Sequence, residues 1–290
     1  MGYSGRYHAA SLAAVFIALA VGILIGIGLA DDVVSSASEE LEASLRSDLK
    51  AAQGEAEELR GALERSDKFG QQILAEVLAG RLVGRRVALV ELGGADAELT
   101  TAARDAVEAA DGRLAAVAEV ALPPDEEALL DDLPGRYARL RLDGDPLAAI
   151  GRAVGRQLSG GGPLIDALAP DLFTRFSGNL RGVDAIVITR SPPEDLAGAE
   201  RDAADGFENA LLGSVAGPSA DVAGAELTTT DPSTLGPIIE AGIPTVDHLD
   251  LPAGKVGLVY ELTGVDGNFG VKEEARGYLP DFGRPPAGQP

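Results

Sequence analysis

One long apolar stretch opens the chain, and charged side chains follow it. Residues 9–30 (AASLAAVFIALAVGILIGIGLA) contain no charged residue. An α-helix rises about 1.5 Å per residue, so about 20 apolar residues cross a hydrocarbon core of about 30 Å. The pattern therefore predicts a transmembrane helix, and residues 1–30 are assigned to an N-terminal segment with its membrane span.

A cleaved signal peptide is the alternative interpretation, because Gly28 and Ala30 are small residues suited to a cleavage site. The apolar run exceeds the length of about 7–15 residues usual for such peptides, which favours an uncleaved anchor. Arg6 precedes the run, and Asp31 and Asp32 follow it. The positive-inside rule then predicts a single-pass protein with a cytoplasmic N-terminus and the bulk of the chain extracytoplasmic.

Gly22 and Gly26 form a G-x-x-x-G pattern inside the apolar run. Small residues at this spacing let two membrane helices approach closely, so this face is a candidate for helix packing. The alternative is that glycine is simply common in membrane helices.

Residues 31–80 have the pattern of a charged helical stalk. Apolar and small residues alternate at spacings of four and three, which is typical of a coiled-coil seam, while the remaining positions are largely charged. The pattern predicts a parallel homodimer or a higher homo-oligomer; the alternative is a single long helix lying on the following domain. The candidate seam residues are Leu45, Leu49, Ala52, Ala56, Leu59 and Leu63, and the spacing continues through Ser66, Gly70, Ile73 and Val77.

Residues 81–280 alternate between short apolar runs and helical patterns, which is typical of an α/β domain. We expect a mostly parallel, Rossmann-like sheet covered by helices. The expected strands are 86–92, 114–122, 183–189, 222–227, a strand near 243–246, and 255–262 (KVGLVYEL). The expected helices are 96–110, 126–133, 146–158, 164–176, 196–212 and 233–241. The Pro- and Gly-rich residues 281–290 are expected to form a disordered tail.

Composition removes several function classes. The formal net charge is −22, which argues against nucleic-acid binding because phosphate contacts need clustered Lys and Arg. The chain has no cysteine, Met1 is its only methionine, and His8 and His248 are its only histidines. Disulfides and thiol catalysis are therefore excluded, and a soft-metal site within one chain is hard to assemble. We expect no metal site and no cofactor.

Two short motifs carry candidate chemistry. Gly93-Gly94-Ala95-Asp96 follows an expected strand and opens a helix, where a nucleotide phosphate could bind, although a tight turn with Asp96 as N-cap is the simpler interpretation. Asp247-His248-x-Asp250 could form a hydrolytic or metal cluster, against a plain turn at a strand end. Neither a G-x-S-x-G elbow nor a phosphate-binding G-x-x-x-x-G-K motif occurs, and no enzyme activity is expected.

Both ends of the chain resemble one known family, the actinobacterial copper transporter family. At the C-terminal end the similar segments are Gly267–Lys272 (GNFGVK) and Ala275–Pro280 (ARGYLP). The family layout of one span, a charged helical stalk and an α/β region also fits. At the N-terminal end the matching positions are His8, Ser11, Leu12, Ala14, Val15, Phe16, Ala18, Leu19, Ala20, Gly22 and Gly26.

The resemblance implies a membrane-anchored cell-envelope protein acting in copper export or homeostasis, and the family is described as an outer-membrane channel. The residues supply few soft ligands, so we expect this chain to act without coordinating copper directly. A corynebacterial relative pairs with an envelope partner at the division septum, which implies the alternative of a non-catalytic scaffold that binds a protein partner. An anchored enzyme using Asp96, Asp247 or His248 is the third hypothesis.

Overall fold

The computed structural model describes residues 5–217 and 220–281, with side chains for 8–26, 41–217 and 220–281. The chain divides into two compact units, residues 1–66 and residues 67–290. The predicted disordered tail, Asp281 apart, lies outside the described residues, as do the side chains of Arg6, Asp31 and Asp32 that set the predicted orientation.

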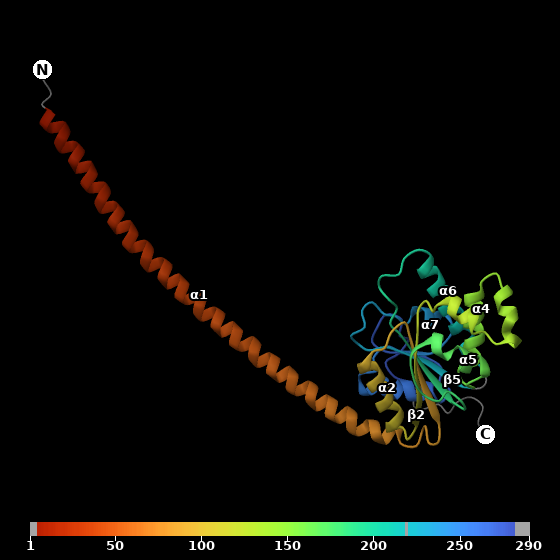
Figure 1. Ribbon diagram of the computed structural model, residues 1–290. Helices are drawn as coiled ribbons and strands as arrows, with labels where there is room; N and C mark the ends of the chain where they lie inside the picture. Colours follow the sequence, from red (N-terminus) through yellow and green to blue (C-terminus); the bar gives the residue numbers. More distant parts are fainter. Residues whose placement is uncertain (1–4, 218–219, 282–290) are drawn as a thin grey trace. The chain divides into compact units, whose positions relative to one another are not determined.

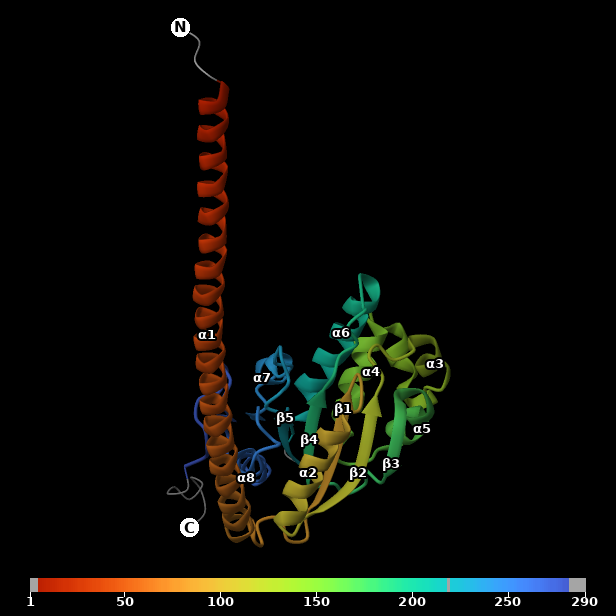
Figure 2. The same ribbon diagram turned by 90° about the vertical axis from the view of Figure 1, so that its left-hand side faces the viewer.

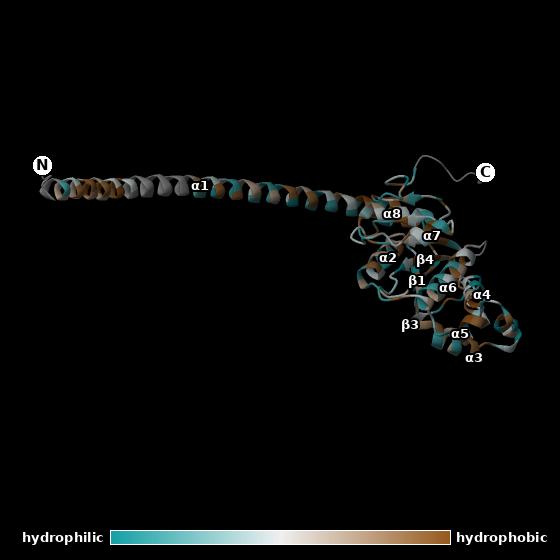
Figure 3. Cartoon of the chain, turned by 90° about the horizontal axis from the view of Figure 1, so that it is seen from above, coloured by the Kyte–Doolittle hydropathy of each residue, from teal (hydrophilic) through white to brown (hydrophobic). Residues whose placement is uncertain are grey.

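A single uninterrupted helix, α1 (Gly5–Leu78), forms the first unit and runs into the second (Figures 1 and 2). Its 74 residues correspond to a length of about 110 Å at about 1.5 Å per residue. Figure 3 shows the apolar residues gathered near its N-terminal end and a mixed pattern further along. Gly54 and Gly61 each weaken a helix interior, yet the helix continues through both.

The second unit is built on a seven-stranded sheet with the order β3-β2-β1-β4-β5-β6-β7. Figure 2 shows the part of this sheet from β3 to β5. All neighbouring strands are parallel except β3, which is antiparallel to β2 at one edge. The strands are β1 (Arg86–Leu92), β2 (Arg113–Val120), β3 (Phe173–Gly178), β4 (Ala185–Arg190), β5 (Asp221–Ala225), β6 (Thr245–Val246) and β7 (Asn268–Phe269).

Helices cover both faces of this sheet, because its central strands are apolar on both sides. In β1, Val87 and Leu89 point into one apolar core, and Val90 and Leu92 into the other. One face is covered by the end of α1, α2 (Ala97–Ala109) and α8 (Pro252–Glu261). The other is covered by α3 (Glu126–Asp131), η1 (Gly135–Leu142), α4 (Pro146–Gly155), α5 (Pro163–Leu172), α6 (Ala199–Val215) and α7 (Gly236–Glu240). The prediction of a mixed α/β domain with a mostly parallel sheet is confirmed.

The predicted strand 255–262 is wrong, because this segment forms helix α8. Pro252 opens the helix at its first turn, where the missing backbone N–H of proline costs nothing. Residues 256–261 are all buried, so no polar face reveals the helical period. A short apolar run that is buried on every side looks the same in sequence whether it is a strand or a helix.

The predicted helix 164–176, for which a break near Pro170 is expected, is wrong over its last four residues. Helix α5 ends at Leu172, and residues 173–178 (FTRFSG) form the edge strand β3. Five of these six residues are exposed, so the strand lacks the apolar alternation that marks a half-buried strand. The two-residue strand β7 was also missed, since it is too short to carry a pattern.

Candidate functional site

Residues His8–Gly26 of α1 are long and apolar enough to cross a membrane. None of this stretch is buried within the protein, and its large apolar side chains are exposed. No atom lies within 4 Å of a Cβ built at Gly22 or Gly26, so both glycines leave an open face on this helix. They lie one turn apart, as the pattern requires for helix packing, and no second helix contacts them in the described residues.

The candidate seam residues lie on α1 and are exposed. Leu45, Leu49, Leu59 and Leu63 each expose 59–63% of their surface. Ala52 and Ala56 complete the four-and-three spacing between them, with Ala56 partly covered. This stripe of leucines has no contact with another apolar residue cluster in the part of the chain that is described.

The last turns of α1 are fixed to the α/β domain. A Cβ built at Gly70 would lie 2.9 Å from Pro252, so α8 approaches the helix closely there. Leu74 and Val77 pack against the same core that buries Leu78 completely. Just beyond, the guanidinium of Arg81 lies 3.9 Å from the ring centre of Tyr260. The final positions of the heptad pattern therefore contact the domain and are not free for a second helix.

At the Gly93–Asp96 motif, the carboxyl ends of β1 and β4 meet, which is where doubly wound sheets bind nucleotides. Gly93 has a φ of +88°, and a Cβ built there would lie 2.6 Å from the carbonyl oxygen of Ser191. The loop after β4 thus lies directly against Gly93. Asp96 caps α2 by accepting hydrogen bonds from the backbone N–H groups of Glu98 and Leu99. The turn and N-cap interpretation fits this geometry.

The carboxylate of Asp247 lies at the end of β6 and is 4% exposed. It accepts hydrogen bonds of 2.8 Å from the backbone N–H groups of Val271 and Lys272. A Cβ built at Gly270 would fall 2.0 Å from this carboxylate, so only glycine fits there. Asp247 therefore fastens the C-terminal segment to the sheet rather than facing solvent.

Next to it, Glu226 follows β5 and is 1% exposed. The ammonium of Lys272 lies 2.6 Å from its Oε1 and also donates to the carbonyl oxygens of Leu227 and Thr230. The hydroxyl groups of Ser233 and Thr234 donate to the same carboxylate. The buried acid and base are thus fully paired, as burial of charge requires.

His248 is completely buried beside this network. Its ring stacks on that of Tyr278 with 5.1 Å between the centres, and Nδ1 lies 3.3 Å from Oδ1 of Asp247. That geometry is not aligned for a hydrogen bond, so both ring nitrogens lack a partner among the described residues. Burial lowers the pKa of the imidazole, against the attraction of Asp247 and Asp250. Asp250 itself accepts from the N–H and hydroxyl of Thr228.

The structure brings Asp247 and His248 together. The carboxylate of Asp247 is already hydrogen-bonded to two backbone N–H groups, and the imidazole of His248 is completely buried. Asp96 belongs to the end of β1 and does not join them. In the described residues no group of three His, Cys, Asp or Glu side chains is arranged to hold a metal ion. Glu226 and the role of Lys272 were missed in the sequence, although Lys272 ends the glycine–aromatic–glycine segment that carries the family resemblance.

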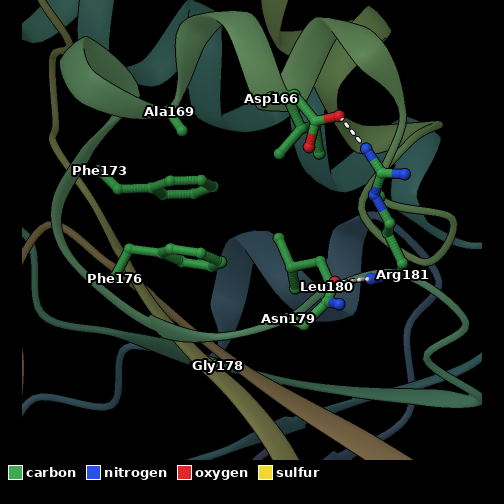
Figure 4. Close-up of a pocket in the computed structure, with 10 residues that line it drawn as sticks. Asp166, Ala169, Phe173, Phe176, Gly178, Asn179, Leu180 and Arg181 are labelled. Carbon is green, nitrogen blue, oxygen red and sulfur yellow. Dashed lines mark hydrogen bonds and ion pairs between the residues drawn. The ribbon is translucent and has the colours of Figure 1, made fainter.

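Two recesses lie in the domain away from these residues. The first, of about 80 Å³, lies between α5 and β3 and is lined by the stacked rings of Phe173 and Phe176, with the Asp166–Arg181 ion pair at its rim (Figure 4). The second, of about 340 Å³, lies beside the amino ends of β6 and β7 and is lined by both Asp266 and Arg276. Neither contains the Asp247–His248 pair.

The fold and the exposed apolar helix define a protein with one helix able to span a membrane and a mixed α/β domain. The chain matches the family described as "Copper transport outer membrane protein, MctB" over residues 3–280. It belongs to this family, which confirms the resemblance found in the two ends of the sequence.

Among characterised relatives are the proteins named copper transporter MctB of Mycobacterium tuberculosis and of Mycobacterium bovis. Each is 33% identical to this chain over 84 residues, which is 29% of this chain and 27% of the relative. The alignments therefore span about a quarter of the relatives' length.

Proposed function

We propose that this chain is a membrane-anchored cell-envelope protein that acts in copper export or homeostasis. The observation that carries the proposal is the family match over residues 3–280, which includes both the apolar helix and the α/β domain. Relatives named copper transporters share this family, and they are the source of the copper assignment.

We propose further that the chain acts without coordinating copper itself. Copper(I) prefers thiolate and thioether ligands, and copper(II) prefers imidazole. The sequence has no cysteine, and Met1, His8 and His248 are its only methionine and histidines. His248 is completely buried inside the domain. With so few side chains able to bind copper, the chain is expected to act indirectly, through a partner protein or an assembly.

The proposed orientation places the N-terminus in the cytoplasm and the stalk and α/β domain outside. It rests on Arg6 before the span and Asp31 and Asp32 after it. A long apolar helix also suits the inner membrane, because a helix satisfies all its backbone groups internally.

A homodimeric coiled coil is the proposed state of the stalk. The exposed stripe of Leu45, Leu49, Leu59 and Leu63 has the spacing of a seam, and two chains anchored in one membrane are already parallel. In a parallel pair the seam spacing places Glu55 of one helix opposite Arg60 of the other, which is an attractive pair. The pattern is expected to end before Gly70, where the domain contacts the helix.

The alternative function is a non-catalytic envelope or division scaffold, and the same exposed stripe favours it. A long helix with an open apolar face is a surface for a helical partner, with no chemistry required. Either function fits a chain without enzyme activity, since Asp247 is saturated by backbone donors and Asp96 serves as a helix cap.

Cell-associated copper, measured in a deletion strain with and without the restored gene, tests the copper assignment. We expect raised copper after deletion and a return to normal with the full-length chain. Restoration with His8→Ala tests direct coordination at the exposed histidine, and we expect it to work as well as the unchanged gene. Unchanged copper after deletion would refute the copper role and leave the scaffold; failure of a stably expressed His8→Ala protein would refute indirect action.

A further inference from the structure

The C-terminal segment, residues 270–280, is attached to the sheet through a few specific contacts. The backbone N–H groups of Val271 and Lys272 donate to Asp247, and the ammonium of Lys272 pairs with Glu226 and donates to the carbonyl oxygens of Leu227 and Thr230. The segment also folds back on β7, where the N–H of Gly270 donates to the carbonyl oxygen of Gly277 and the N–H of Arg276 donates to that of Asn268. This return brings Tyr278 over His248.

Tyr278 is half-exposed, whereas the imidazole beneath it is not exposed at all. Movement of the Tyr278 ring would uncover the face of the imidazole on which it stacks, and a proton on the imidazole could then be hydrated. A histidine that is hydrated in one conformation and buried in another has a different pKa in each, so pH changes the equilibrium between the two conformations.

We propose that His248 makes the attachment of residues 270–280 dependent on pH, so that acid releases this segment from the ends of β5 and β6. In the closed arrangement the imidazole is neutral and acts as an aromatic surface for Tyr278. Acid favours the open arrangement, which exposes the carboxylates of Asp247 and Glu226. The proposal is independent of the copper role.

The charged groups around the imidazole determine how readily His248 is protonated. Asp247 and Asp250 face it and attract a proton, while Lys272 and Glu226 beside it form a neutral pair. Oδ1 of Asp247 accepts from the N–H of Val271 and has a second lone pair that faces Nδ1 of the imidazole. Nε2, in contrast, has no hydrogen-bond partner among the described residues. The N–H that a protonated imidazole carries at Nε2 is therefore left without an acceptor in the closed arrangement, which disfavours that arrangement in acid.

The sign of the pH dependence follows from the burial. The pKa of His248 is lowered in the closed state, because burial outweighs the two carboxylates. The open and unfolded states therefore bind the proton more readily. The attachment is complete above the ordinary histidine pKa of about 6.5 and weakens as the pH falls below it.

A spin label on Val271 tests this, since its side chain is exposed and the chain has no native cysteine. The full-length protein carrying Val271→Cys is labelled in lipid nanodiscs, and label mobility is measured between pH of about 7.5 and about 5.0. We expect the mobile fraction to increase severalfold in acid. A label at Val83→Cys, exposed near the end of α1, is the matched control and should not change.

The same measurement with His248→Phe should give a label that stays immobile across the pH range, because phenylalanine stacks on Tyr278 without titrating. If His248→Phe does not fold, as judged by its thermal transition at neutral pH, His248→Asn replaces it and should likewise remove the pH dependence. An unchanged label in the wild-type background, or an equal acid response in the histidine variants, would overturn the proposal.

Discussion

Gly93 lies so close to the loop after β4 that only a residue without a side chain fits there. The residue has a φ of +88°, and its missing Cβ leaves room for the carbonyl oxygen of Ser191. Gly93→Ala should lower the free energy of unfolding by about 1–3 kcal/mol, through both backbone strain and the clash. Chemical denaturation measures this. Gly94→Ala is the control, because its Cβ would lie 3.5 Å from the same oxygen and should change stability by less than about 0.5 kcal/mol. Equal effects would show that the Ser191 contact does not matter.

Glu261 is a buried carboxyl group without a hydrogen-bond partner in the described residues. Burial raises its pKa well above the ordinary value of 4.5, and the nearby Asp266 adds to the effect. The folded protein then keeps the proton while the unfolded chain releases it. The stability contribution is therefore full below about pH 4.5 and is lost as the pH rises toward the raised pKa.

Glu261→Gln should remove this loss, because the amide does not ionise. Relative to the variant, the wild-type protein should lose on the order of 1–3 kcal/mol of stability as the pH rises from about 4.5 to about 7. Urea denaturation at a series of pH values measures the difference. Glu240→Gln, on an exposed side chain, is the matched control and should follow the wild-type curve. A constant difference between wild type and Glu261→Gln at every pH would contradict the assignment.

At the scale of elements, the apolar runs in the sequence predicted where buried elements lie better than whether each element is a strand or a helix. The run 86–92 lies between two helical layers as a strand, and 255–262 is equally apolar yet forms α8. Composition alone does not separate the two, since both are buried on every side. Pro252 was the available signal, because proline at this position favours a helix start. Strand β3 lacked any signal, since its place at the sheet edge leaves its side chains exposed.

The stalk prediction is tested by cysteine crosslinking, for which the cysteine-free chain gives no background. Leu45→Cys lies on the candidate seam, and Ser47→Cys lies on the opposite face of the same helix turn. We expect mild oxidation of membranes to give a disulfide-linked dimer with Leu45→Cys and little with Ser47→Cys. A parallel, in-register pair brings the two copies of residue 45 together along the seam. Equal crosslinking at both positions would indicate random collision, and none at either would favour a single helix.

At the scale of the whole molecule, the candidate site shows what one sequence cannot reveal. The pair Asp247–His248 was found because its members are adjacent in the chain. The structural role of the pair depends on Lys272 and Tyr278, which are distant in sequence and contact the pair only in the folded chain. The partner of Glu226 lies 46 residues away, and no local spacing relates the two. A motif that suggests chemistry in sequence therefore fastens the chain's C-terminal segment in the structure.

The orientation of the chain decides where that domain works, and two single cysteines measure it. Ser4→Cys precedes the span, and Ser66→Cys follows it on an exposed part of α1. Because Arg6 is expected to stay in the cytoplasm, a membrane-impermeant maleimide on intact spheroplasts should label Ser66→Cys and leave Ser4→Cys unlabelled until the membrane is permeabilised. The reverse pattern would place the acidic domain in the cytoplasm.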